Sequence, residues 1–262
     1  MQRAVSVPNV GDPHALIDLA GEVEAAGWDG FFVWDHVQIY GPARFEVHDP
    51  WMLLAAIARS TPRVRLGAMV TPPSRRRPWV LAKQMVTLDH LSGGRALFGI
   101  GLGFPDDDEF GAFGDSADPR VRAAQTDEAL TIIDRILRGE PVDHDGEHFT
   151  VHAHLHPRAV QAPRPPIWCA ATPPHRKPLE RARRWDGVFL NVRLDTLLPL
   201  RPAQVREYVG DLLDDPGFTV ATSPHPEHTA DEYEAAGVGW LVETRWPGPT
   251  WLADLRAQIG LA

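Results

Sequence analysis

The stretch Gly30-Phe31-Phe32-Val33-Trp34-Asp35-His36 decides the fold and also points to the functional site. A short apolar run of this kind is typical of a strand that is buried in a parallel sheet. Here the run ends directly in an acid and an imidazole. Ligands bind outside the carboxyl ends of parallel strands, so we expect a polar pair at this position to face a bound ligand and not the core. Asp35 and His36 are therefore the first candidates for catalytic residues.

Strand-like runs alternate with amphipathic helical patterns along the whole chain. Asp49-Pro50 and Arg77-Pro78 place a proline where a helix can begin, and Gly139 stands where one can end. Eight βα units in one chain, without a linker-like change in composition, favour a closed (β/α)8 TIM-like barrel over an open doubly wound sheet. We expect a single α/β domain over residues 1–262, with strands at residues 4–7, 30–34, 64–70, 96–101, 167–171, 187–191, 218–222 and 238–243.

Composition excludes several classes of partner. The formal net charge is -9 and no basic block offsets the acid excess, which argues against nucleic acid or an anionic membrane surface. No apolar run approaches the roughly 20 residues that span a bilayer, and no charged and apolar leader opens the chain, so we expect a cytoplasmic protein. Cys169 is the single cysteine. An intrachain disulfide or a thiolate metal cluster is therefore ruled out.

Residues 139–166 form an excursion between the fourth helix and the fifth strand. The segment is rich in His, Pro and charge, and Asp145-Gly146 is a candidate tight turn. We interpret it as a hairpin covering a helix or as part of a subunit interface, in preference to a substrate lid. His152, His154 and His156 alternate and could share one face of a strand. Because no carboxylate or cysteine stands in register with them, we expect no bound metal.

Two further patterns concern a cofactor. Gly99, Gly101 and Gly103 alternate, but no helix follows at once, so they do not fit a dinucleotide-binding fingerprint. Glycine at a strand end either lets a flat ring approach the backbone or eases a crowded barrel mouth. After the fifth strand stand Thr172, Arg176 and Lys177. A hydroxyl and two cations near a helix start form either an anion site or an ordinary cap with solvated charges.

Several motifs occur together and in order, which makes them a specific signal. With them the chain resembles the bacterial-luciferase-like superfamily of flavin- or deazaflavin-dependent oxidoreductases over nearly its whole length. The motifs are Trp34-Asp35-His36, residues 66–72, residues 75–79, residues 88–95, Gly99-Ile100-Gly101-Leu102-Gly103, residues 108–114 and residues 163–167.

The resemblance assigns roles to single residues. It places a cis peptide bond at Met69-Val70, and with Thr71 these residues would contact the cofactor ring, as would Gly101 and Gly103. It makes the site of Thr172, Arg176 and Lys177 a phosphate anchor. It implies that His36 assists proton transfer while Asp35 orients it. Tyr40 and Phe104 would contact substrate. Phe104 stands where the sugar-phosphate dehydrogenase branch has an acidic glutamate, which argues against that branch.

The resemblance implies hydride transfer to or from a small organic substrate with coenzyme F420. One alternative is a monooxygenase that uses reduced FMN and O2, since deazaflavin carries hydride whereas reduced flavin activates oxygen. The other alternative is a degenerate barrel that binds cofactor without catalysis or serves as a structural subunit. Asp35-His36 favours F420. We expect a homodimer that acts on a small molecule and has neither nucleic acid nor membrane as partner.

Overall fold

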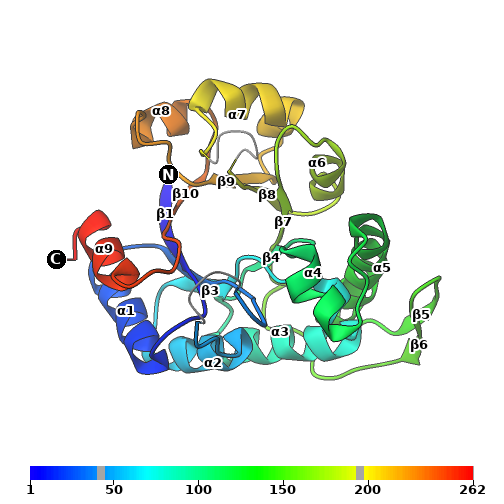
Figure 1. The fold of residues 1–262 in the computed structure, drawn as a ribbon. Coiled ribbons are helices and arrows are strands. Elements are labelled where there is room, and N and C mark those ends of the chain that lie inside the picture. The colour runs from blue at the N-terminus through cyan, green and yellow to red at the C-terminus, as the bar shows by residue number, and fades with distance from the viewer. Residues whose placement is uncertain (40–44, 193–197, 262) are drawn as a thin grey trace.

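The computed structural model describes residues 1–39, 45–192 and 198–261. Eight parallel strands form one sheet that curves into a ring, as Figure 1 shows. Parallel bridges Leu66–Ala96 and Thr71–Ile100 join β3 to β4 and close the ring. This confirms the (β/α)8 barrel. In ring order the strands are β1 (Gln2–Val7), β2 (Gly30–Val33), β3 (Arg65–Ala68), β4 (Phe98–Ile100), β7 (Ile167–Ala171), β8 (Gly187–Leu190), β9 (Thr219–Thr222) and β10 (Trp240–Thr244).

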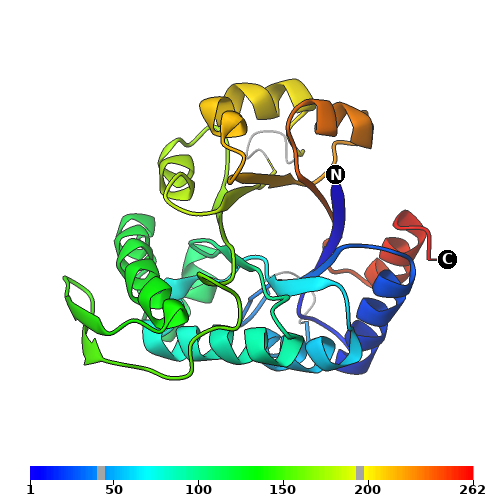
Figure 2. The same ribbon diagram turned by 180° about the vertical axis from the view of Figure 1, so that it is seen from behind.

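Helices surround the ring on its outer side, as the views from both ends show (Figures 1 and 2). Local signals fix their ends: the Asp49 side chain caps α2 by accepting from the Trp51 and Met52 amides, and Gly139 ends α5 in the left-handed conformation. The helices are α1 (Pro13–Ala25), α2 (Pro50–Ser60), α3 (Pro78–Ser92), α4 (Asp106–Glu109), α5 (Pro119–Arg138), α6 (Lys177–Ala182), α7 (Pro202–Val209), α8 (Ala230–Ala235) and α9 (Trp251–Gln258), with 3-10 turns η1 (Pro73–Arg75), η2 (Gly111–Phe113) and η3 (Gly210–Asp214).

Side chains fill the inside of the barrel. Phe32, Trp168 and Trp240 pack with ring centroids 5.6–6.4 Å apart, in the tilted or edge-on geometry that aromatic rings prefer. Close backbone approach beside them requires glycine, since a Cβ at Gly67 would lie 1.8 Å from the Leu97 carbonyl oxygen. The barrel is thus a packed core, and ligands have access only at its ends. Its inner cluster comprises Ala4, Phe32, Met69, Leu97, Trp168, Phe189, Ala221, Trp240 and Val242.

The excursion at residues 139–166 contains an antiparallel hairpin of β5 (Val142–Asp145) and β6 (Thr150–Ala153), which projects beyond α5 in Figure 1. The segment thus contains a hairpin, whereas its covering of a helix and its part in a subunit interface stay predictions. His152 on β6 lies 2.5 Å from Asp143 and 3.2 Å from Asp145, which both belong to β5. These carboxylates lie across the hairpin from His152, where the sequence pattern offered no partner.

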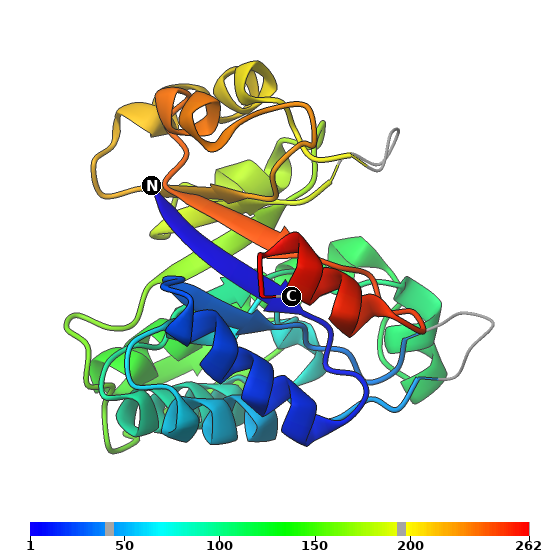
Figure 3. The ribbon, with the colours of Figure 1, turned by 90° about the vertical axis from the view of Figure 1, so that its left-hand side faces the viewer.

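In side view, β1 and β10 run together toward the end of the barrel where α9 lies (Figure 3). All eight strands are parallel, so their carboxyl ends meet at this end, which we call the mouth. The loops after β2, β3, β4 and β7 carry most of the predicted site residues to the mouth. Within the described ranges, no helix has the length and apolar character that a membrane crossing requires.

Candidate functional site

Asp35 lies just after β2 and is the centre of a buried ionic network. Its side chain is fully buried and pairs with Arg75 at 2.5 Å and with Arg76 at 2.7 Å. The Thr71 hydroxyl and the Trp51 indole N–H also donate to its Oδ2. Burial by itself would raise the pKa of the Asp35 carboxyl, but the charges of Arg76 and Arg75 outweigh burial and lower that pKa below its usual value. Asp35 is therefore held as a carboxylate.

His36 faces a different acid. Its Nδ1 lies 3.0 Å from Oε1 of Glu109, a residue of α4 whose side chain is fully buried. Glu109 also accepts the backbone amides of Val37 and Gln38 at 3.1 Å. We expected Asp35 to orient the imidazole, but both Asp35 oxygens accept from other donors, and in this structure Glu109 takes that position. Glu109 holds the ring through Nδ1 and directs Nε2 away from that contact.

Arg75 joins the two acids. One of its terminal nitrogens donates to Asp35 and the other contacts Glu109, while its side chain is only 7% exposed. The guanidinium thus bridges the loop after β2 to α4. Two carboxylates and two arginines balance in charge, which offsets the cost of burying them. The network fixes the loop that carries His36 but presents no free charge of its own to the mouth.

The backbone of His36 is fixed from the β1 side. The buried Asn9 amide donates to the carbonyl oxygens of His36 at 2.8 Å and His48 at 2.6 Å. Trp34 is fixed as well, because its indole N–H donates to the Ser6 hydroxyl at 3.1 Å. Its ring meets the His36 ring edge-on with centroids 5.9 Å apart. The imidazole therefore sits in a preorganised frame of hydrogen bonds and aromatic contact.

The end of β3 shows the cis peptide bond at Met69-Val70 that the resemblance implies. Val70 is half-buried and packs on top of the inner cluster, with half-buried Ala170 of β7 nearby. Together they give the mouth an apolar floor. Thr71 is fully buried and its hydroxyl donates to Asp35, so it belongs to the ionic network, and its contact with cofactor stays a prediction. Met69 is nearly buried within the inner cluster and offers little surface to a ligand.

The glycines after β4 are explained by packing within the protein. A Cβ at Gly101 would lie 2.5 Å from a Val70 methyl carbon. Gly103 has a φ of 80°, and a Cβ there would lie 2.5 Å from the Phe110 ring. Of the two interpretations of these glycines, the crowded barrel mouth is the one that the contacts support. Gly101 acts on the floor indirectly, because it makes room for Val70.

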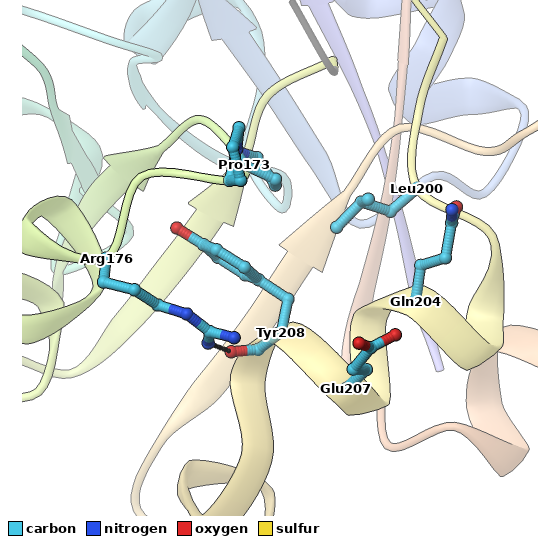
Figure 4. Close-up of a pocket in the computed structure, with 7 residues that line it drawn as sticks. Pro173, Arg176, Leu200, Gln204, Glu207 and Tyr208 are labelled. Atoms are coloured by element: carbon cyan, nitrogen blue, oxygen red, sulfur yellow. Dashed lines mark hydrogen bonds between the residues drawn. The ribbon is translucent and has the colours of Figure 1, made fainter.

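Cations follow β7, but not at a capped helix start. Arg176 donates to the Tyr208 carbonyl at 2.6 Å and lies over the Tyr208 ring. Thr172 does not cap α6; its hydroxyl accepts from Asn191 at 3.3 Å. Lys177, at the first position of α6, is exposed. Beside Arg176 is a cavity of about 160 Å³ between this loop and α7, drawn in Figure 4, which is lined by Pro173, Pro174, Arg176, Leu200, Gln204, Glu207 and Tyr208.

Two predicted substrate contacts have different outcomes. Phe104 follows β4 and is 61% exposed, in a loop that leads into α4, so its position suits a substrate contact. Tyr40 lies outside the described residues. The lone Cys169 is buried in β7, and burial raises the pKa of its thiol to about 12, as expected for a core residue.

Sequence reasoning missed Glu109, Arg75 and Arg76. Glu109 closes a run of four acids, and nothing in the run marks which member is buried. The arginines at residues 75–77 carried a usable signal, because three adjacent cations just after a barrel strand need buried or solvent partners. Trp246 was also missed: it is 64% exposed, and its ring packs edge-on against Trp34 at 5.1 Å.

Comparison with known proteins adds the family. A family model described as luciferase-like monooxygenase matches residues 1–258. The chain belongs to the luciferase-like monooxygenase family. Within it, an F420-dependent glucose-6-phosphate dehydrogenase of Kineococcus radiotolerans is 33% identical over 170 residues, which cover 62% of this chain and 48% of that protein. The chain spans only 35–48% of the length of four curated relatives.

Solved structures agree on the fold. An F420-dependent secondary alcohol dehydrogenase in complex with an F420-acetone adduct has a TM-score of 0.78 at 16% identity, covering 98% of this chain and 97% of that one. The oxygenating constituent of 3,6-diketocamphane monooxygenase from Pseudomonas putida, in complex with FMN, has a TM-score of 0.66 at 15% identity, covering 85% and 67%. Proteins that share this fold therefore include one solved with an F420 adduct and one solved with FMN.

Proposed function

We propose that this protein is an F420-dependent oxidoreductase that moves a hydride to or from a small organic substrate, with His36 as its proton-transfer residue. The observation that carries this proposal is the His36 imidazole, held through Nδ1 by buried Glu109 at the barrel mouth. A ring fixed at one nitrogen keeps its other nitrogen available for a proton. Relatives named for F420-dependent dehydrogenation support the same reading.

The residues at the mouth fit such a cofactor. Val70 and Ala170 form an apolar floor that suits the face of a flat ring. Across the floor, the loop after β7 carries the exposed side chains of Arg176 and Lys177, which suit an anionic tail. Arg176 is also bound to the Tyr208 carbonyl, so we expect Lys177 to contribute more to anion binding.

When bound, F420 supplies a two-electron hydride donor or acceptor. The chain accepts or supplies the proton, according to the direction of the reaction. In alcohol oxidation His36 Nε2 takes the proton from the substrate hydroxyl as the carbon loses hydride, and in ketone reduction it returns a proton to the carbonyl oxygen. Glu109 faces Nδ1 and stabilises the imidazolium that His36 becomes while it holds the transferred proton. The Asp35 network keeps the loop in place without touching the reacting atoms.

The first experiment identifies the cofactor. Purified protein is titrated separately with F420 and with FMN while ring fluorescence is recorded. We expect F420 to bind at micromolar or better affinity and FMN to bind more weakly. The alternative, a monooxygenase that uses reduced FMN and O2, draws support from the relative solved with FMN. Tight FMN binding without F420 binding would establish that alternative in place of the proposal.

The second experiment addresses His36. We expect His36→Ala to retain fold and F420 affinity but to lower turnover by on the order of 10²–10⁴, the usual effect of losing a general acid or base. The matched control is His90→Ala, which removes an exposed imidazole from the last turn of α3, at the end of that helix away from the mouth. Single-turnover rates that match wild type in a folded His36→Ala variant would remove His36 from the reaction.

A further inference from the structure

Three aromatic rings form a row along one side of the mouth. Trp246, in the loop after β10, packs edge-on against Trp34 with centroids 5.1 Å apart, and Trp34 packs edge-on against His36 at 5.9 Å. In ring order β10, β1 and β2 are neighbours, so the row crosses the carboxyl end of β1. Trp246 is 64% exposed, whereas Trp34 beneath it is tied to Ser6. A rigid inner ring thus supports a large exposed one beside the imidazole.

The charges on this side of the mouth disfavour an anionic ligand. Arg75 and Arg76 are committed to Asp35 and Glu109. Beside His36, the Gln38 amide contacts the backbone of Asp108, so the acids of α4 border the same rim. Arg245, the residue before Trp246, pairs with Asp254 at 3.5 Å. A phosphate or carboxylate placed here would therefore meet acids, together with cations that already have acidic partners, and like charges in contact weaken binding.

The exposed cations named above follow β7, which lies on the opposite side of the ring from β1. The mouth therefore has an aromatic side at β10, β1 and β2 and a cationic side at β7. An anionic cofactor tail fits the cationic side, which leaves the side with the exposed Trp246 ring and the partly exposed His36 imidazole for a second molecule. Apolar surfaces rimmed by a few polar groups are typical of small-molecule sites.

We propose that the oxidoreductase site inferred above, on whose reaction this assignment rests, takes a neutral aromatic ketone or alcohol, and that Trp246 determines this specificity. The substrate ring packs on the exposed face of Trp246, where edge-on or offset contact between aromatic rings is favourable. Its carbonyl or hydroxyl oxygen then points to His36, two residues from Trp34 on the same strand end. Trp246 binds substrate and takes no part in moving the proton.

The test uses the whole protein labelled with 5-fluorotryptophan and observed by 19F NMR, with the Trp246 signal assigned from Trp246→Phe. Acetophenone is added once with saturating F420 and once without it. We expect the Trp246 signal to move in a saturable way and Trp246→Ala to bind acetophenone about tenfold more weakly. Trp79→Phe, on the outer helix α3, is the matched control and should bind as wild type does.

The second probe is 4-acetylbenzoate, which adds a carboxylate to the same ring and ketone. We expect it to bind at least about tenfold more weakly than acetophenone. A Trp246 signal that stays still in both titrations, or equal affinity for the two probes, overturns the assignment. No turnover is needed for these readouts. Acetophenone bound at Trp246 in a protein that does not bind F420 would refute the proposed reaction and leave the substrate site standing.

Discussion

Replacing Asp35 with Asn should destabilise the protein without directly changing the reacting groups. The side chains of Asp35, Arg75 and Arg76 are 0%, 7% and 16% exposed, so the substitution leaves cations in a poorly hydrated place. Removing one partner of a buried pair costs about 3–5 kcal/mol. Arg75 keeps Glu109 as a partner, which favours the lower end of that range. For a chain of this size, the loss corresponds to a fall of roughly 6–20 °C in melting temperature.

Calorimetry and single-turnover kinetics on the same Asp35→Asn sample are the assay. The exposed pair of Asp211 with Arg183 supplies the control, since Asp211→Asn should leave the melting temperature almost unchanged. The pKa of Asp35 is lowered in the fold, so its stabilisation is present above the unfolded pKa and is lost as pH falls through the lower folded value. The difference between wild type and Asp35→Asn should therefore persist from pH 5 to 8 and shrink only in strong acid, below about pH 4. A melting temperature within about 2 °C of wild type at pH 7 would refute this account of the network.

Two other substitutions probe the frame of the site. Glu109→Gln should lower kcat by about tenfold or more with little change in KM. The 15N chemical shifts of the His36 ring should report an altered tautomer. Wild-type chemical shifts in this variant would count against Glu109 as a positioning residue. Gly101→Ala pushes a Cβ into Val70 and should cost about 1–3 kcal/mol of stability and weaken F420 binding, whereas Gly21→Ala, with open space around it, should be harmless. Equal thermal melts for the two alanine variants would contradict the packing argument.

The barrel was predictable because each part of the signal is local. Eight apolar runs mark the strands, and the structure ends them within a few residues of the expected positions. Proline and glycine signals also held: α2 begins at Pro50, α3 begins at Pro78 and α5 ends at Gly139. The short α4 was missed, because four consecutive acids carry no apolar periodicity and its position depends on contacts made through Glu109.

Only the local part of the site was predictable in the same way. Asp35 and His36 stand out because they follow a strand directly. Glu109 is 73 residues away from His36, and only folding shows which acid of α4 is buried against it. Trp246 is one of nine tryptophans, and its exposure follows from a loop beyond β10 that has no periodic pattern. Contacts between distant loops at a barrel mouth are set by the closed sheet as a whole.

Strand alternation explains why two adjacent residues have separate roles. Successive side chains of β2 point to opposite sides of the barrel wall. Phe32 belongs to the inner cluster and Val33 to the outer core, so Trp34 and His36 continue the inward set while Asp35 continues the outward one. The contact of Asp35 with the indole of Trp51 on α2, an outer helix, agrees with this direction. A residue on the outer side cannot orient an imidazole on the inner side, so that task falls to an acid from another loop. The alternation of side chains along residues 30–36 therefore places the structural carboxylate of Asp35 and the imidazole of His36 on opposite sides of the barrel wall, even though they are neighbours in sequence.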